Sequence, residues 1–126
     1  MTEAVWKLAG KKALLLRRQA IAAAIRDFFY ARDFLEVETS NRIPAPAPEV
    51  HVDSFSSETW FLHPSPEVCM KRLLAAGYER LFQICKCYRD GERGARHLPE
   101  FTLLEWYRAG EDYTALMADC ENLLAD

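Results

Sequence analysis

Apolar residues at helical spacing open the chain. Within residues 12–32 they recur at the three- and four-residue steps of an amphipathic helix, and charged residues take other positions. Residues 66–77 show a second helical pattern, with Ser65 as a cap ahead of it and Gly77 as the stop. Residues 113–124 are helical by the same spacing. The pattern therefore predicts a long first helix and two later ones.

β-prone runs lie between these helices, at residues 34–39, 50–55, 59–62, 80–88 and 101–107. The second and third runs predict a hairpin around a turn at 56–58, and the last two flank a polar loop at 90–98. Three prolines within residues 40–48 predict a loop without regular pairing. Because consecutive strands follow one another without crossover helices, we expect an α+β fold with a mainly antiparallel sheet flanked by helices.

Composition limits the class of protein. A chain of 126 residues, 50% hydrophobic, is long enough for one domain or one large piece of a domain. Its net charge of -3 argues against nucleic-acid binding through bulk positive charge. No apolar run approaches the roughly 20 residues of a membrane span, and no signal peptide is recognisable. We expect a cytoplasmic protein without a membrane partner.

The cysteines and histidines show no metal-binding spacing. The four cysteines form no C-x-x-C pair, and the three histidines are not paired in sequence. Cys85 and Cys87 would share one face of a strand, where they are poorly placed for a disulfide. Reduced cysteines and no protein-bound metal are therefore expected.

A basic loop is the first candidate site. The segment from residue 89 to 107 brings Arg89, Arg93, Arg96 and His97 into one loop bounded by strands. An arginine held at a strand end presents a planar fork to carboxylate or phosphate oxygens. The alternative is a solvated hairpin tip whose charge is balanced by neighbouring acids such as Glu92.

A carboxylate on an apolar strand face is the second candidate. Glu105 and Tyr107 alternate with other residues so that they share a face with Phe101. Burying an ionised carboxylate costs several kcal/mol without compensation, so Glu105 needs a cation or hydrogen bonds. A bound ammonium group and an internal ion pair with Arg80 or Arg108 are equally compatible with the pattern.

Two further features have plain structural explanations. Glu67 lies in the first turn of its helix, where the macrodipole favours an acid. Aromatic residues on the strands belong more often to a core than to a base-stacking surface. No glycine-rich phosphate loop of the P-loop or dinucleotide type is present.

Three motifs resemble the catalytic domains of class II lysyl-tRNA synthetase-like proteins. Residues 34–39, FLEVET, resemble the end of the first class II motif, which forms dimer contacts in that family. Residues 65–74, SPEVCMKRLL, resemble the segment whose glutamate contacts the substrate amine. Tyr88-Arg89 followed by residues 96–107, RHLPEFTLLEWY, resembles the second motif. The resemblance implies a class II synthetase-like fold and a homodimer formed through the first motif.

The second motif implies an ATP site. By resemblance, Arg89 contacts the α-phosphate and the substrate carboxylate. Arg96 and His97 would lie near the ATP tail, and Phe101 would stack on adenine. A glycine stands two positions after Arg89 where the motif usually has glutamate, so Glu92 is expected to substitute through a shifted loop.

The resemblance also implies a pocket for the substrate amine, lined by Glu67, Glu105 and Tyr107. ATP and Mg²⁺ would activate the amino acid carboxylate to an aminoacyl-adenylate. Positioning and charge neutralisation supply most of the catalysis in such a reaction. No covalent protein nucleophile is required, and Arg89 is the expected catalytic residue.

Two features favour the GenX/PoxA branch of this family, the elongation factor P lysyltransferases. The first catalytic-type helix begins near the N-terminus, which leaves no room for an anticodon-binding domain, and tRNA is therefore not the expected partner. Residues 105–108, EWYR, resemble this branch's version of the motif. The branch implies lysine or (R)-β-lysine as the amino acid and a lysine of elongation factor P as the acceptor.

The motifs divide the chain into an N-terminal extension, residues 1–11, and the N-terminal portion of a catalytic domain, residues 12–126. The glycine-rich third motif with its ATP-binding arginine is absent from the sequence, so the domain is expected to be incomplete. Two alternatives remain open at this point. One is a non-catalytic fragment or partner-binding paralogue, and the other is a lysyl-tRNA synthetase that charges tRNA.

Overall fold

The computed structural model describes residues 3–125, which divide into two compact units. We call them the helical unit, residues 3–33 and 113–125, and the sheet unit, Phe34–Asp112. The helices of the helical unit are α1 (Glu3–Ala9), α2 (Lys12–Tyr30) and α4 (Tyr113–Ala125). The prediction of helices at 12–32 and 113–124 is confirmed, whereas α1 was not predicted and falls in the segment expected to be an extension.

Helix α2 is anchored at its C-terminal end. Phe28 and Phe29 are buried there, with their rings edge to face at 5.1 Å between centroids. The guanidinium of Arg32 lies 3.6 Å from the centre of the Phe28 ring and donates a hydrogen bond to the Phe28 carbonyl. Asp33 adopts a positive φ of 59°, which cannot continue the helix. The chain therefore leaves α2 at a fixed point.

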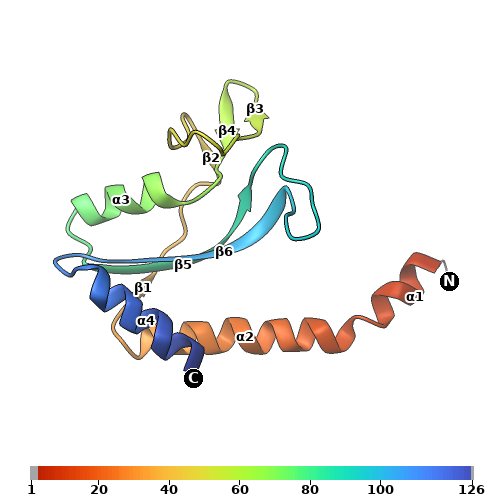
Figure 1. Cartoon of the computed structure of the whole chain (residues 1–126), viewed down its shortest axis with the longest axis horizontal. Helices are drawn as coiled ribbons and strands as arrows, with labels where there is room; N and C mark the ends of the chain where they lie inside the picture. The colour runs from red at the N-terminus through yellow and green to blue at the C-terminus, as the bar shows by residue number, and fades with distance from the viewer. Residues whose placement is uncertain (1–2, 126) are drawn as a thin grey trace. The chain divides into compact units, whose positions relative to one another are not determined.

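The main sheet of the sheet unit has the strand order β1-β5-β6 (Figure 1). Its strands are β1 (Leu35–Glu36), β5 (Arg80–Tyr88) and β6 (Glu100–Arg108). β5 and β6 form a long antiparallel hairpin whose register runs from Arg80 opposite Arg108 to Tyr88 opposite Glu100. β1 pairs with β5 in parallel. The predicted hairpin around the polar loop 90–98 is confirmed, and antiparallel pairing predominates in the described sheets.

A second, smaller sheet differs from the prediction. Its strands are β2 (Arg42–Ile43), β3 (Ser56–Ser57) and β4 (Trp60–Leu62), in the order β2-β4-β3. The loop predicted over 40–48 contains β2, because pairing is complete before the first of its prolines. The strand predicted over 50–55 is also wrong. Glu58 takes a positive φ of 57° in the turn, so the preceding serines pair with β4 as β3.

Helix α3 (Glu67–Ala75) packs beside β5. The Glu67 backbone N–H donates to the Ser65 hydroxyl at 3.1 Å, which gives the predicted cap a physical basis. Gly77 takes a φ of +97° just beyond the helix, as the sequence indicated for its end. The mixture of helices with antiparallel sheets agrees with the expected α+β class.

Within residues 3–125, no helix combines the length and the apolar character needed to cross a membrane.

Candidate functional site

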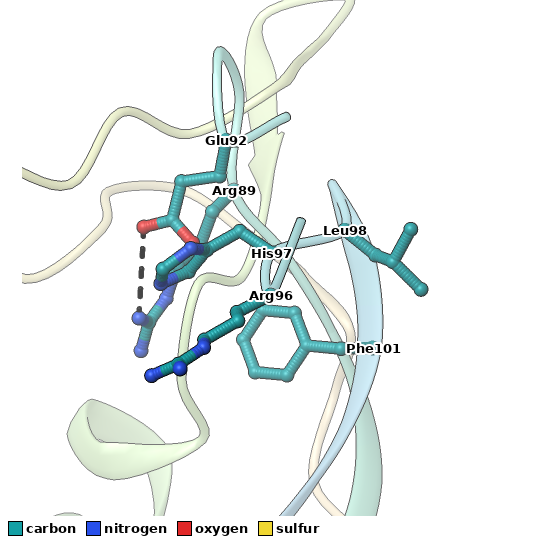
Figure 2. A pocket seen from close by; sticks show the side chains of 6 residues that line it. All are labelled: Arg89, Glu92, Arg96, His97, Leu98 and Phe101. Atoms are coloured by element: carbon teal, nitrogen blue, oxygen red, sulfur yellow. Dashed lines mark ion pairs between the residues drawn. The ribbon is translucent and has the colours of Figure 1, made fainter. Parts of the chain in front are cut away.

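A pocket of about 210 Å³ opens where β5 leads into the loop toward β6. It is lined by Arg89, Glu92, Arg96, His97, Leu98 and Phe101. Five of these residues belong to the loop and Phe101 lies at the start of β6, and they meet because the antiparallel hairpin brings the two ends of the loop together. All five residues that the sequence assigned to ATP lie around this pocket. Figure 2 shows the sixth, Leu98, pointing away from the Arg89–Glu92 pair.

Arg89 is held in place from three sides. Its Nε donates to the Pro64 carbonyl oxygen at 3.3 Å, and its Nη1 lies 3.8 Å from Oε1 of Glu92 (Figure 2). Its guanidinium also lies 5.0 Å from the centre of the Phe101 ring. A cation that is already oriented over an aromatic ring is suited to an anionic ligand whose flat part stacks on that ring.

The loop that carries the remaining pocket residues is tied at its base. The Arg89 backbone N–H donates to the Pro99 carbonyl at 2.9 Å, and the Asp90 N–H donates to the Asp53 carbonyl at 2.8 Å. Arg96 and His97 lie further out and are exposed. The fixed base and the exposed cationic tip fit a pocket in which one end of a ligand is held tightly and the other lies near solvent.

A second group of side chains lies along the same side of the hairpin. Residues that are directly opposite in antiparallel strands project to one face. We call this side the site face, and it carries Leu81, Gln83, Cys85, Cys87, Phe101, Leu103, Glu105 and Tyr107. The predicted grouping of Phe101, Glu105 and Tyr107 on one strand face follows from this register.

Glu105 is bonded by two hydroxyl groups. Ser65 Oγ donates to its Oε2 at 2.7 Å and Tyr107 Oη donates to its Oε1 at 2.6 Å. The alternative of an ion pair with Arg80 or Arg108 is wrong. Both guanidiniums contact Glu111 instead, at 3.5 and 3.0 Å. Among residues 3–125, the Glu105 carboxylate is therefore balanced by neutral donors and has no cation bound to it.

Burial, and next the hydrogen bond to Glu105, raise the pKa of the Tyr107 phenol well above its usual value. The phenol therefore stays protonated and donates to the carboxylate. The two hydrogen bonds give the Glu105 carboxyl group a fixed orientation on the site face.

Glu67 lies next to this group but is otherwise engaged. Its Oε1 contacts Lys71 Nζ at 2.5 Å, an ion pair one helical turn along α3. The hydrogen bond that Lys71 donates to this carboxylate raises the pKa of its ammonium group. Ser65 connects the two acids, since its hydroxyl accepts from the Glu67 N–H and donates to Glu105. The sequence indicated Ser65 as a cap and missed this second contact, which depends on the position of β6.

A third group, His63, Cys85 and Cys87, was not predicted. The two sulfurs are 3.7 Å apart, and Cys87 Sγ lies 4.0 Å from His63 Nε2. A hydrogen bond from the Cys87 thiol is the largest of the effects that lower the pKa of Cys85 to about 6, and burial partly opposes it. Burial would lower the pKa of His63, but its hydrogen bonds with Cys85 and the Lys86 carbonyl raise it. The only sequence signal was that Cys85 and Cys87 share a strand face.

Comparison with protein families and with curated proteins places these groups in context. Residues 6–126 match the family described as tRNA synthetases class II (D, K and N). A protein of Pseudoalteromonas translucida named "Elongation factor P--(R)-beta-lysine ligase" is 42% identical over 98% of this chain and 41% of its own length. Proteins with the same name from Haemophilus ducreyi and Salmonella paratyphi B are 42% and 43% identical, over 98% and 96% of this chain and 41% and 40% of their own lengths. The chain thus spans about two fifths of the relatives it matches.

Proposed function

Because this chain belongs to the class II tRNA synthetase family of the D, K and N type, we propose that it takes part in ATP-dependent activation of a lysine-type amino acid. The substrate we infer is (R)-β-lysine, and the acceptor is a lysine of elongation factor P. The names of the relatives support both inferences. The observation that carries the proposal is Glu105, an acid whose hydrogen-bond partners among residues 3–125 are two hydroxyl groups, on the face that leads to the Arg89 pocket.

The pocket supports the ATP end of this proposal. Phe101 provides a ring on which adenine stacks, and Arg89 places a cation within 5.0 Å of that ring. Arg96 extends the positive charge toward the outer phosphates, and the ring of His97 can donate a hydrogen bond to them. Positive groups already oriented toward the phosphates cost no reorganisation when the reaction proceeds, and for this reason they stabilise its transition state.

Mg²⁺ would accompany ATP in this reaction. It is bound in proteins by one or two carboxylates together with substrate phosphates, and seldom by a complete protein cage. Glu92 supplies a carboxylate among the residues that line the pocket, so the donor set fits such an ion. When bound, the ion neutralises phosphate charge, and Glu92 would hold it while Arg89 orients the α-phosphate.

Glu105, Tyr107 and Glu67 support the amine end. In the structure, two hydroxyl groups donate hydrogen bonds to Glu105. An ammonium group of the substrate beside Glu105 would add a cation as a partner for this carboxylate. Tyr107 fixes the position of that carboxylate. Glu67 forms an ion pair with Lys71 in the structure. To bind the substrate amine, Glu67 would have to release Lys71 and take the amine as its partner.

The chemistry follows from holding the two ligands in line. The amino acid carboxylate attacks the α-phosphorus of ATP, an aminoacyl-adenylate forms and pyrophosphate leaves. Arg89 neutralises charge on both the carboxylate and the α-phosphate, and the amine site fixes the attack direction. The acceptor amine then displaces AMP from the adenylate, so no residue of the chain needs to form a covalent bond.

ATP–pyrophosphate exchange tests the proposal. The chain is assayed with α-lysine, with (R)-β-lysine and without an amino acid, and exchange stimulated most by (R)-β-lysine is expected. Transfer of labelled amino acid to elongation factor P and to tRNA is then compared, and only the first is expected. Absence of amino-acid-dependent exchange would show that the chain alone does not activate an amino acid.

A homodimer through the first motif is part of the same proposal. Its strand, β1, is at one edge of the described sheet, and Leu35 on it is 50% exposed. An edge strand with an exposed apolar side chain is suited to contact with a second copy. Light scattering is expected to give twice the chain mass, and Leu35→Ser is expected to lower it. A cytoplasmic location stays a prediction.

A further inference from the structure

The group formed by His63, Cys85 and Cys87 lies outside the residues that the proposed reaction uses. Its three ligand-type atoms, one from each side chain, all lie within 4.8 Å of one another. His63 and Cys87 are fully buried and Cys85 is half-buried. From this geometry we propose that the three side chains bind a Zn²⁺ ion on the site face of β5.

The spacing of the sulfurs agrees with tetrahedral coordination. With bonds of about 2.3 Å from zinc to sulfur, two thiolates in a tetrahedral site stand about 3.8 Å apart. The Sγ atoms of Cys85 and Cys87 are 3.7 Å apart, within a hydrogen bond of each other and close to this tetrahedral spacing. The same two cysteines are poorly placed for a disulfide. Their separation therefore fits shared coordination.

The imidazole of His63 turns one of its two nitrogens toward the sulfurs. Its Nε2 lies 2.7 Å from the Lys86 carbonyl oxygen, which can only accept, so Nε2 carries the proton. Its Nδ1 is buried and has no hydrogen-bond partner among residues 3–125. The nitrogen that faces the sulfurs is Nε2, 4.0 Å from Cys87 Sγ, so Nε2 is the ligating atom and would give up its hydrogen bond to the Lys86 carbonyl when the ion binds. A histidine that binds a metal through one nitrogen carries its proton on the other, so the ring proton would move to Nδ1.

The donor atoms select the ion. Thiolate sulfur and imidazole nitrogen favour Zn²⁺ over Mg²⁺, which prefers oxygen ligands. The site is therefore distinct from the Mg²⁺ that would accompany ATP. Coordination displaces the thiol protons of Cys85 and Cys87 to solvent. Three protein ligands leave a fourth coordination position for water. Cys85 is half-buried, so solvent can reach this position beside it.

Zinc bound there would fix the segment between β4 and α3 against β5. His63 begins this segment, and the next two residues provide the Pro64 carbonyl that accepts from Arg89 and the Ser65 hydroxyl that donates to Glu105. Both ends of the proposed active site therefore depend on a segment that the ion would hold. We assign the ion a positioning role, with no part in the reacting atoms.

Metal binding is measured on the 126-residue chain under a phosphine reductant, without ATP or amino acid. Co²⁺ is titrated as a spectroscopic probe, and zinc content is measured after dialysis against a zinc buffer. We expect a sulfur-to-cobalt charge-transfer band that saturates at one equivalent and disappears when Zn²⁺ is added. Cys85→Ser and Cys87→Ser are expected to weaken binding at least about tenfold. Cys120→Ser, an exposed thiol on α4, is the matched control and should bind as the unmodified chain does.

The unmodified chain decides the question even where a variant fails to fold. Absence of the sulfur-to-cobalt band in that chain, with circular dichroism showing it folded, would overturn the site. Binding that survives in folded Cys85→Ser and Cys87→Ser proteins would overturn it as well. Because no nucleotide or amino acid is present, this outcome is independent of the exchange assay and leaves the proposed reaction to its own test.

Discussion

The strand β5 and the helix α2 differ in how many of their residues are buried. Among the nine residues of β5, the apolar residues Leu81, Phe82 and Cys87 are buried, together with Gln83. α2 has nineteen described residues and buries two, while others that are large and apolar stay more than half exposed: Leu14, Leu15, Leu16 and Ile21. The sheet unit thus forms its own core beside the candidate site. The helical unit leaves apolar surface uncovered among the residues that the structure describes.

The same substitution in both regions tests this contrast most directly. Leu81 is fully buried on β5, so Leu81→Ala should lower the free energy of unfolding by about 2–5 kcal/mol. Leu14 is 61% exposed on α2, so Leu14→Ala should change it by no more than about 0.5 kcal/mol. Urea denaturation followed by circular dichroism measures both. Equal losses for the two variants would contradict the division into a packed sheet and an uncovered helix.

The second test concerns the chemistry of the sheet unit. Arg89→Ala removes the cation that is held by Pro64 and stacked near Phe101, and it should lower (R)-β-lysine-dependent pyrophosphate exchange by about 100- to 1,000-fold. The fold should persist, because the arginine lies at the strand end and outside the core. Arg42→Ala removes an exposed arginine paired with Glu58 and serves as the charge-matched control. A similar loss of exchange activity in both variants would mean that the change in net charge causes it, and not the loss of Arg89 from the pocket.

The third test separates the amine site from the ATP site. Glu105→Gln keeps the shape of the side chain and removes its charge, so the KM for the amino acid should rise about tenfold to a hundredfold. The KM for ATP should stay nearly constant. Glu58→Gln, an exposed acid on the turn between β3 and β4, is the control. A rise in the KM for ATP alone would place Glu105 in the nucleotide site and contradict the proposal.

Local patterns predicted the elements that carry the site. The register of β5 and β6 follows from two β-prone runs around a polar loop, and it brings Arg89 and Phe101 together without information from distant segments. The helix α2 was predicted for a similar reason, since its spacing is regular over many turns. A helix or strand is therefore identified from sequence when its pattern of apolar and polar residues stays regular over many residues.

Contacts between distant segments were not predictable. His63 comes from the segment after β4 and meets Cys87 only because that segment crosses β5. Arg80 and Arg108 form ion pairs with Glu111 and not with Glu105, because Glu111 follows the end of the hairpin and lies beside them. The short strands were missed for a related reason. Two-residue pairings such as β2 depend on what lies opposite and leave no periodic pattern in the sequence.

The smallest expected effect concerns Tyr107 and the stability of the sheet unit at high pH. Its folded pKa is raised well above the roughly 10 of a free phenol, so above about pH 10 the unfolded chain loses this proton while the folded chain keeps it. The unfolded state then binds fewer protons, and the free energy of unfolding falls as pH rises, by at most about 1.4 kcal/mol per pH unit from this group. Tyr107→Phe removes that contribution, so its urea midpoint should decline less steeply between pH 10 and 11 than that of the unmodified chain. Between pH 7 and 9 the difference between the two proteins should stay constant, because neither state of Tyr107 titrates there. Parallel curves up to pH 11 would mean that the phenol is not held by Glu105, and the proposed orientation of that carboxylate would lose its support.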